Sequence, residues 1–144
     1  MPLNSELIFF IPNTENAKEI PFVADGIKAG FPSPAADFDG TKISIDQLVI
    51  KNEVATFYAK ASGHSMIGAG IDDGDILVID RSIEPAHNKI AVCFIDGDFT
   101  IKRIKIEEDC VYLQPENPKF KSIKVTEDND LIIWGIVTYV VKKV

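Results

Sequence analysis

The sequence is short of positive charge. It has 15 Lys and Arg residues against 22 Asp and Glu residues among 144, which gives a formal net charge of −7. Phosphate backbones and anionic lipid surfaces repel an acidic chain. The charge therefore argues against direct sequence-specific nucleic-acid binding and against a basic peripheral membrane protein.

Cysteine and histidine are scarce as well. The two cysteines, Cys93 and Cys110, do not form a CxxC motif, and one pair cannot make a disulfide framework. The two histidines, His64 and His87, are not spaced with the cysteines as metal ligands are. We therefore expect no metal site and no other cofactor, and thiols that fit a reducing cytoplasm.

Long apolar runs are missing too. A membrane helix needs roughly 18–20 consecutive apolar residues. The first apolar segment, Leu7–Ile11, stops at Pro12 and lacks the basic flank of a signal peptide. These features predict a cytoplasmic protein without a membrane anchor.

What the chain does contain falls into two parts. Residues 1–40 hold five of the eight prolines and no helical period of ten residues, which predicts an extended, flexible arm that packs only locally. From residue 41 onward, short runs rich in β-branched and aromatic residues alternate with turn residues, which predicts a compact, mostly β domain at 41–144 with a curled or partly closed sheet. The predicted strands are 43–45, 56–59, 76–79, 89–95, 99–106, 111–114, 123–125 and 132–142.

Asp96-Gly97 predicts a tight hairpin because both central positions of such a turn need positive φ. A short helix is expected near Ile45 or Ser65.

The segment Ser62-Gly63-His64-Ser65-Met66 follows a predicted strand and precedes a glycine-rich stretch. Glycines permit a sharp turn, so Ser65 is expected to be exposed, with backbone N–H groups near it that could meet an oxyanion. A plain polar surface loop is the alternative. The GxSxG elbow is not met, because Ile67 stands where its second glycine would be.

A nucleophilic serine needs a base. His64 is its immediate neighbour, so the two side chains diverge, and His87 lies in a predicted solvated loop. In the strand 99–106, alternation places Lys102 on one face with Ile104 and Ile106. Keeping a lysine neutral at pH 7 costs roughly 4.6 kcal/mol, and burial lowers its pKa by about 3–5 units, so a buried Lys102 could act as a base. A lysine that snorkels at a sheet edge is the alternative.

Two further motifs carry weaker signals. Small residues at Ala29-Gly30, in an extended segment flanked by Pro32, could enter a narrow cleft. The acidic turn Asp72-Asp73-Gly74-Asp75 lacks the spaced ligands of a calcium loop and is read as a solvated turn.

Taken in order, these motifs resemble the LexA/UmuD family of self-cleaving Ser-Lys peptidases, in its UmuD-like branch. The matching segments are Ala29–Asp37, Lys60–Met66, Gly74-Asp75, Asp96-Gly97 and Phe99–Lys102, and the resemblance runs from about Pro21 to the end.

The resemblance implies that Ser65 is the nucleophile and Lys102 the uncharged general base. It further implies that the backbone N–H groups of His64 and Ser65 hold the oxyanion, and that the bond between Ala29 and Gly30 is cut. The implied fold is the LexA-type peptidase domain, working as a homodimer in the bacterial cytoplasm. A RecA filament on single-stranded DNA would promote cleavage in the SOS response to DNA damage. The trimmed chain would then serve a Y-family, UmuC-type translesion polymerase.

Three alternatives remain. A LexA-type or phage-type repressor would need a DNA-reading domain before Gly30, where only 29 residues stand. A signal-peptidase relative would need a membrane anchor. A pure interaction module with an inert site would require that Lys102 is not buried beside Ser65.

Overall fold

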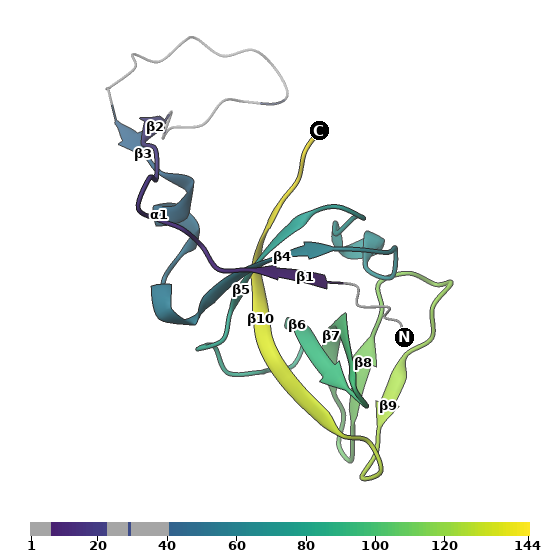
Figure 1. Cartoon of the computed structure of the whole chain (residues 1–144). Coiled ribbons are helices and arrows are strands. Elements are labelled where there is room, and N and C mark those ends of the chain that lie inside the picture. The colour runs from purple at the N-terminus through teal and green to yellow at the C-terminus, as the bar shows by residue number, and fades with distance from the viewer. Residues whose placement is uncertain (1–6, 23–28, 30–40) are drawn as a thin grey trace. The chain divides into compact units, whose positions relative to one another are not determined.

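The computed structural model describes residues 7–22, 29 and 41–144 (Figure 1). The chain divides into two compact units, one of residues 1–12 with 52–144 and one of residues 13–51. Each unit is described by itself below. Gly30 and residues 31–40 of the predicted arm lie outside the described residues.

The larger unit contains an antiparallel, eight-stranded sheet in the order β1-β4-β5-β10-β6-β7-β8-β9 (Figure 1). Its strands are β1 (Leu7–Phe10), β4 (Thr56–Ala61), β5 (Ile76–Asp80), β6 (Ile90–Ile95), β7 (Asp98–Ile106), β8 (Val111–Gln114), β9 (Ile123–Val125) and β10 (Leu131–Val141). The sheet is curled, and the prediction of a mostly β fold with a curled or partly closed sheet is confirmed (Figure 1). From residue 56 onward the structure contains the predicted strands, with small changes at their ends. The sequence predicted them because alternating apolar residues mark the faces that become buried.

The hairpin between β6 and β7 has the predicted turn. Asp96 and Gly97 have φ values of +49° and +92°, and Ile95 pairs with Asp98 across the turn. Two consecutive positive φ values match the right-handed twist of the flanking strands.

Strand β10 joins the two halves of the sheet. Its first half pairs with β6 and its second half with β5, with a register shift on the β6 side between Ile133 and Gly135. A Cβ on Gly135 would lie 2.6 Å from Cγ2 of Ile79, so only glycine lets β10 approach β5 this closely.

The arm prediction was wrong for its first described segment. Strand β1 pairs antiparallel with β4, with Leu7 opposite Ala61 and Phe10 opposite Tyr58. Leu7 is 3% exposed. This segment therefore belongs to the sheet rather than packing only locally.

Buried side chains form two clusters. The first consists of Leu7, Ala59, Ala61, Met66, Ile71, Leu77, Ile79, Val92 and Ile101. The second consists of Ala91, Cys93, Ile95, Ile104, Leu113 and Ile136. On β7, Ile101 belongs to the first cluster and Ile104 to the second, so both faces of this strand are covered.

The smaller unit contains a two-stranded ladder and a short helix. Strand β2 (Ile20–Pro21) pairs with β3 (Lys42–Ile43), and helix α1 (Ile45–Val49) follows, where the sequence predicted a short helix. Ser44 and Val49 are the buried residues at its two ends. No helix in the described parts of the chain is long and apolar enough to cross a membrane.

Candidate active site

Ser65 and Lys102 meet in the interior of the larger unit. The Lys102 amine lies 3.2 Å from the Ser65 hydroxyl oxygen, and the two residues are 37 positions apart in the sequence. Each is 6% exposed. The alternation of β7 thus predicted the burial of Lys102 correctly, whereas Ser65 is not exposed as expected.

The Lys102 amine has two more partners on its own strand. It donates to the Thr100 hydroxyl at 2.6 Å and to the Ile101 carbonyl at 3.0 Å. On the neighbouring strand β6, Ala91 lies opposite Lys102. A rigid strand in the middle of the sheet therefore fixes where the amine points.

Glu116 and Asn117, which follow β8, bind the segment Ser62–Met66, called the serine loop below. The backbone N–H of Glu116 donates to the Ser65 carbonyl at 2.8 Å. The side-chain amide of Asn117, itself 8% exposed, donates to the His64 carbonyl at 2.8 Å. The sequence did not indicate this role of Asn117.

The carbonyl of Glu116 accepts a further bond from the turn that follows the serine. Gly68 lies in a 3-10 turn (Ile67–Ala69), and its N–H donates to that carbonyl at 2.7 Å. A Cβ on Gly68 would stand 2.6 Å from the same oxygen. Glycine at this position therefore permits the close contact between the serine loop and the segment after β8.

The acidic turn supports the other end of the loop. The carboxylate of Asp73 accepts from the N–H of Gly63 at 2.8 Å, and Gly63 has a φ of +96°. Left-handed backbone of this kind favours glycine. The chain therefore turns at Gly63 and carries Ser65 back toward β7.

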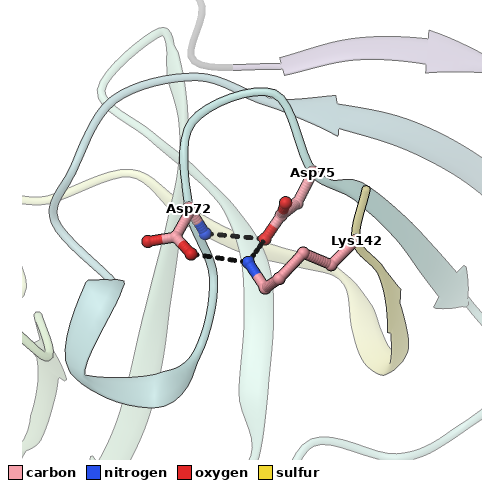
Figure 2. A network of polar contacts seen from close by, with 3 residues as sticks. All are labelled: Asp72, Asp75 and Lys142. Carbon is pink, nitrogen blue, oxygen red and sulfur yellow. Dashed lines mark hydrogen bonds and ion pairs between the residues drawn. The ribbon is translucent and has the colours of Figure 1, made fainter. Parts of the chain in front are cut away.

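The acidic turn is itself bound to the end of β10. The Lys142 amine donates to the Asp72 carboxylate at 2.6 Å. It also donates to Asp75, which accepts from the N–H of Asp72 as well (Figure 2). Burial alone would raise the pKa of Asp75, but the Lys142 hydrogen bond, the Asp72 N–H and the Lys142 charge together lower it. The hydrogen bonds that Lys142 donates to Asp72 and Asp75 raise the pKa of Lys142. The turn predicted to be solvated is therefore partly a buried ion-pair site.

The backbone N–H groups of His64 and Ser65 donate to no residue in the described parts of the chain, whereas both carbonyls are bonded. Adjacent free N–H groups beside a hydroxyl are the donors that an oxyanion requires. Neither histidine is a described partner of the Ser65 hydroxyl, and Nδ1 of His87 instead accepts from the N–H of Ile106 at 2.9 Å.

Lys102 also borders open space. An open pocket of about 370 Å³ is lined by Lys102 and Thr100, together with Ile95, Asp96, Asp98, Phe99 and Ile123. A polypeptide segment could approach the amine from this side.

Cys93 lies on β6 opposite Thr100. Burial raises the pKa of its thiol to about 12, although the charge of Lys102 opposes that shift. A thiol with this pKa stays protonated at neutral pH and is a poor nucleophile.

The predicted cleavage site is described on one side only. Ala29 is an exposed residue in a bend of the smaller unit, and Gly30 lies outside the described residues. The scissile bond therefore stays a prediction.

Known proteins resemble this chain over most of its length. The sequence profile of the Peptidase S24-like family matches residues 21–138. "Protein ImpA" of Salmonella typhimurium and "Protein MucA" of Escherichia coli are each 36% identical over 134 residues, which is 92% of this chain and 90% of theirs. "LexA repressor 1" of Geobacter sulfurreducens is 32% identical over 133 residues, which is 92% of this chain but 65% of the repressor. With these matches and a buried Ser-Lys contact in a curled β-sheet, the chain belongs to the Peptidase S24-like family, as a UmuD-like member of its LexA/UmuD group.

Proposed function

We propose that this protein is a self-cleaving serine endopeptidase that cuts the bond between Ala29 and Gly30. Ser65 is the nucleophile and Lys102 the general base. The observation that carries the proposal is the 3.2 Å contact between a lysine amine and a serine hydroxyl, both of them buried. The family membership supports the same chemistry.

The described hydrogen bonds of Lys102 are compatible with an uncharged amine. A neutral amine has two N–H donors and one lone pair. The Ile101 carbonyl can only accept, and the Thr100 hydroxyl can take the second N–H. The lone pair then faces the Ser65 hydroxyl, which donates its proton. Burial favours the neutral form of an amine, because the charged form loses its hydration.

The reaction then runs in two steps. Nζ of Lys102 takes the proton of Ser65 as Oγ bonds to the carbonyl carbon of Ala29, and the N–H groups of His64 and Ser65 hold the oxyanion. The bond to Gly30 breaks as its nitrogen takes the proton from Lys102, which leaves Ala29 as an ester on Ser65. Water hydrolyses this ester and frees a carboxylate on Ala29, with Lys102 again moving the proton.

The resemblance of the motifs and the similar known proteins support the proposed biological role. The chain acts in the SOS response of a bacterium, in the cytoplasm and as a homodimer. A RecA filament on single-stranded DNA stimulates the cut, in its own chain or in a partner subunit. The trimmed form, Gly30–Val144, is the accessory subunit of a Y-family, UmuC-type translesion polymerase.

A transcriptional repressor is the second candidate, because "LexA repressor 1" matches 92% of this chain. The net charge of −7 opposes it. A gel-shift assay with operators of damage-induced genes tests it, and retardation of the DNA would favour the repressor.

The test of the peptidase is incubation of the pure full-length protein at about pH 10, near the ordinary pKa of lysine, with mass spectrometry of the products. We expect a fragment that begins at Gly30. Ser65→Ala and Lys102→Met should leave the chain whole, and Ser62→Ala, an exposed serine three residues earlier, should be cut like the parent. Cleavage of the Ser65→Ala protein at Ala29 would overturn the assignment.

A further inference from the structure

Strand β1 occupies one edge of the eight-stranded sheet. It pairs with β4 from Leu7–Ala61 to Phe10–Tyr58, and among the described residues no strand lies beyond it in the sheet order. The opposite edge of β4 pairs with β5. Without β1, the edge of β4 would present unpaired N–H and C=O groups, which readily accept another extended strand.

The side chains of β1 pack against a surface beside β4 that includes Phe99 and Trp134, called the groove below. Leu7 is 3% exposed, while Ile8 next to it is 59% exposed. The ring of Phe9 lies 5.0 Å from that of Phe99 and 4.6 Å from that of Trp134. Alternate residues of β1 thus point into the first buried cluster and away from it.

The aromatic side chains of this groove, Phe99 and Trp134, also pack against residues outside β1. Trp134 packs against Phe57 at 5.1 Å, and the guanidinium of Arg81 lies 4.4 Å above its ring. Phe99 packs against Phe94 at 4.9 Å. The groove should therefore keep its shape when β1 leaves.

Strand β1 stands before Ala29, whereas every other strand of its sheet follows Gly30 in the sequence. In the intact chain the connection holds β1 at an effective concentration in the millimolar range. A cut between Ala29 and Gly30 ends this advantage and leaves the released fragment bound by the four-residue β1 and the two-residue β2 alone.

We propose that β1 is a removable cover of a strand-acceptor groove on β4, and that after the cut this groove binds an extended apolar segment of a different protein. The proposal rests on the proposed self-cleavage for its trigger. The present occupant defines the ligand: about four extended residues with large apolar side chains two positions apart, the second of them aromatic. A second trimmed copy lacks β1, so it cannot supply this strand.

The test severs β1 without using Ser65. In the full-length Ser65→Ala protein, a recognition sequence for a site-specific protease is inserted in the turn between Thr14 and Ala17 and then cut by that protease. The probe is a fluorescent peptide of residues 5–12. We expect the cut protein to bind this peptide at least about ten-fold more tightly than the uncut protein does. The same peptide carrying Phe9→Asp should not bind.

Circular dichroism of the cut protein shows whether the sheet stays folded, and hydrogen exchange should show faster exchange confined to the amides of β4. Three binding results would overturn the proposal. They are equal binding of the peptide to cut and uncut protein, binding to neither protein, and a severed β1 that the peptide never replaces. Unfolding on cutting would overturn it as well. Because Ser65 is absent throughout, none of these results bears on the peptidase assignment, and failed self-cleavage in the parent protein would leave the groove in place.

Discussion

The N–H of Gly68 donates to the carbonyl of Glu116 at 2.7 Å, and a Cβ on Gly68 would lie 2.6 Å from that same oxygen. Glu116 in turn donates its own N–H to the carbonyl of Ser65. Ser65, the proposed nucleophile, is thus held through a backbone contact that leaves no room for a side chain on Gly68.

Gly68→Ala should therefore destabilise the fold and slow self-cleavage. Both atoms in the clash belong to rigid segments, so overpacking should cost roughly 1–3 kcal/mol. Urea unfolding measures the loss of stability, and the rate of appearance of the fragment measures activity. Ser62→Ala, at an exposed position of the same loop, should match the parent in both. A Gly68→Ala protein with unchanged stability would show that the contact is looser than described.

Asn117 should prove necessary for the position of the serine loop. Its side-chain amide donates to the His64 carbonyl, and its side-chain oxygen accepts from the N–H of Lys119 at 3.0 Å. Asn117→Asp keeps the acceptor but loses the donor, so it isolates the bond to His64. We expect a loss of about 1–3 kcal/mol in stability, because a buried carbonyl loses its partner, together with slower cleavage. If Asn117→Asp cleaves at the parental rate, this bond does not position Ser65.

Much of this architecture was predictable from the sequence, and the reason is local. Alternation in β7 placed Lys102 on a buried face, and Asp96-Gly97 fixed the hairpin before it. The role of Asn117 was not predictable, because its partner His64 is 53 positions away. The pairing of β1 was missed for the same reason: five apolar residues before a proline carry no signal for the distant strand that they join. Ser65 was expected to be exposed because its loop is rich in glycine, yet the segment after β8 covers it.

The ion pair of Asp75 and Lys142 predicts how stability changes with pH. The lowered pKa of Asp75 contributes stability above its ordinary value of 3.8, which is lost as pH falls through the lowered pKa. The raised pKa of Lys142 contributes stability below 10.5, which is lost as pH rises through the raised pKa. Lys142→Met should therefore lower the Tm at neutral pH, and the difference from the parent should shrink toward both extremes. Lys143→Met is the matched control and should change the Tm little. A Tm difference that does not vary with pH would contradict the role of the ion pair.

The hairpin turn should tolerate side chains poorly at its second position. Gly97 has a φ of +92°, which costs a residue with a Cβ roughly 1–2 kcal/mol. Gly97→Val should lower the stability by at least that amount without abolishing cleavage, because Gly97 precedes β7 and supplies none of the proposed reacting groups. Thermal unfolding and the cleavage assay together check this expectation. A stable Gly97→Val protein would mean that the turn adopts another geometry.

The rate of self-cleavage as a function of pH tests the central claim most directly. The rate constant for formation of the Gly30–Val144 fragment is measured by mass spectrometry on full-length protein and on Lys102→Met, whose side chain has a similar length but no base. The account predicts that the rate constant of the parent rises tenfold per pH unit and levels off below the ordinary lysine pKa of about 10.4. At this plateau, the rate constant of Lys102→Met should be lower than that of the parent by a factor of at least about 100. A rate that does not depend on pH, or a Lys102→Met protein that follows the parental curve, would contradict it.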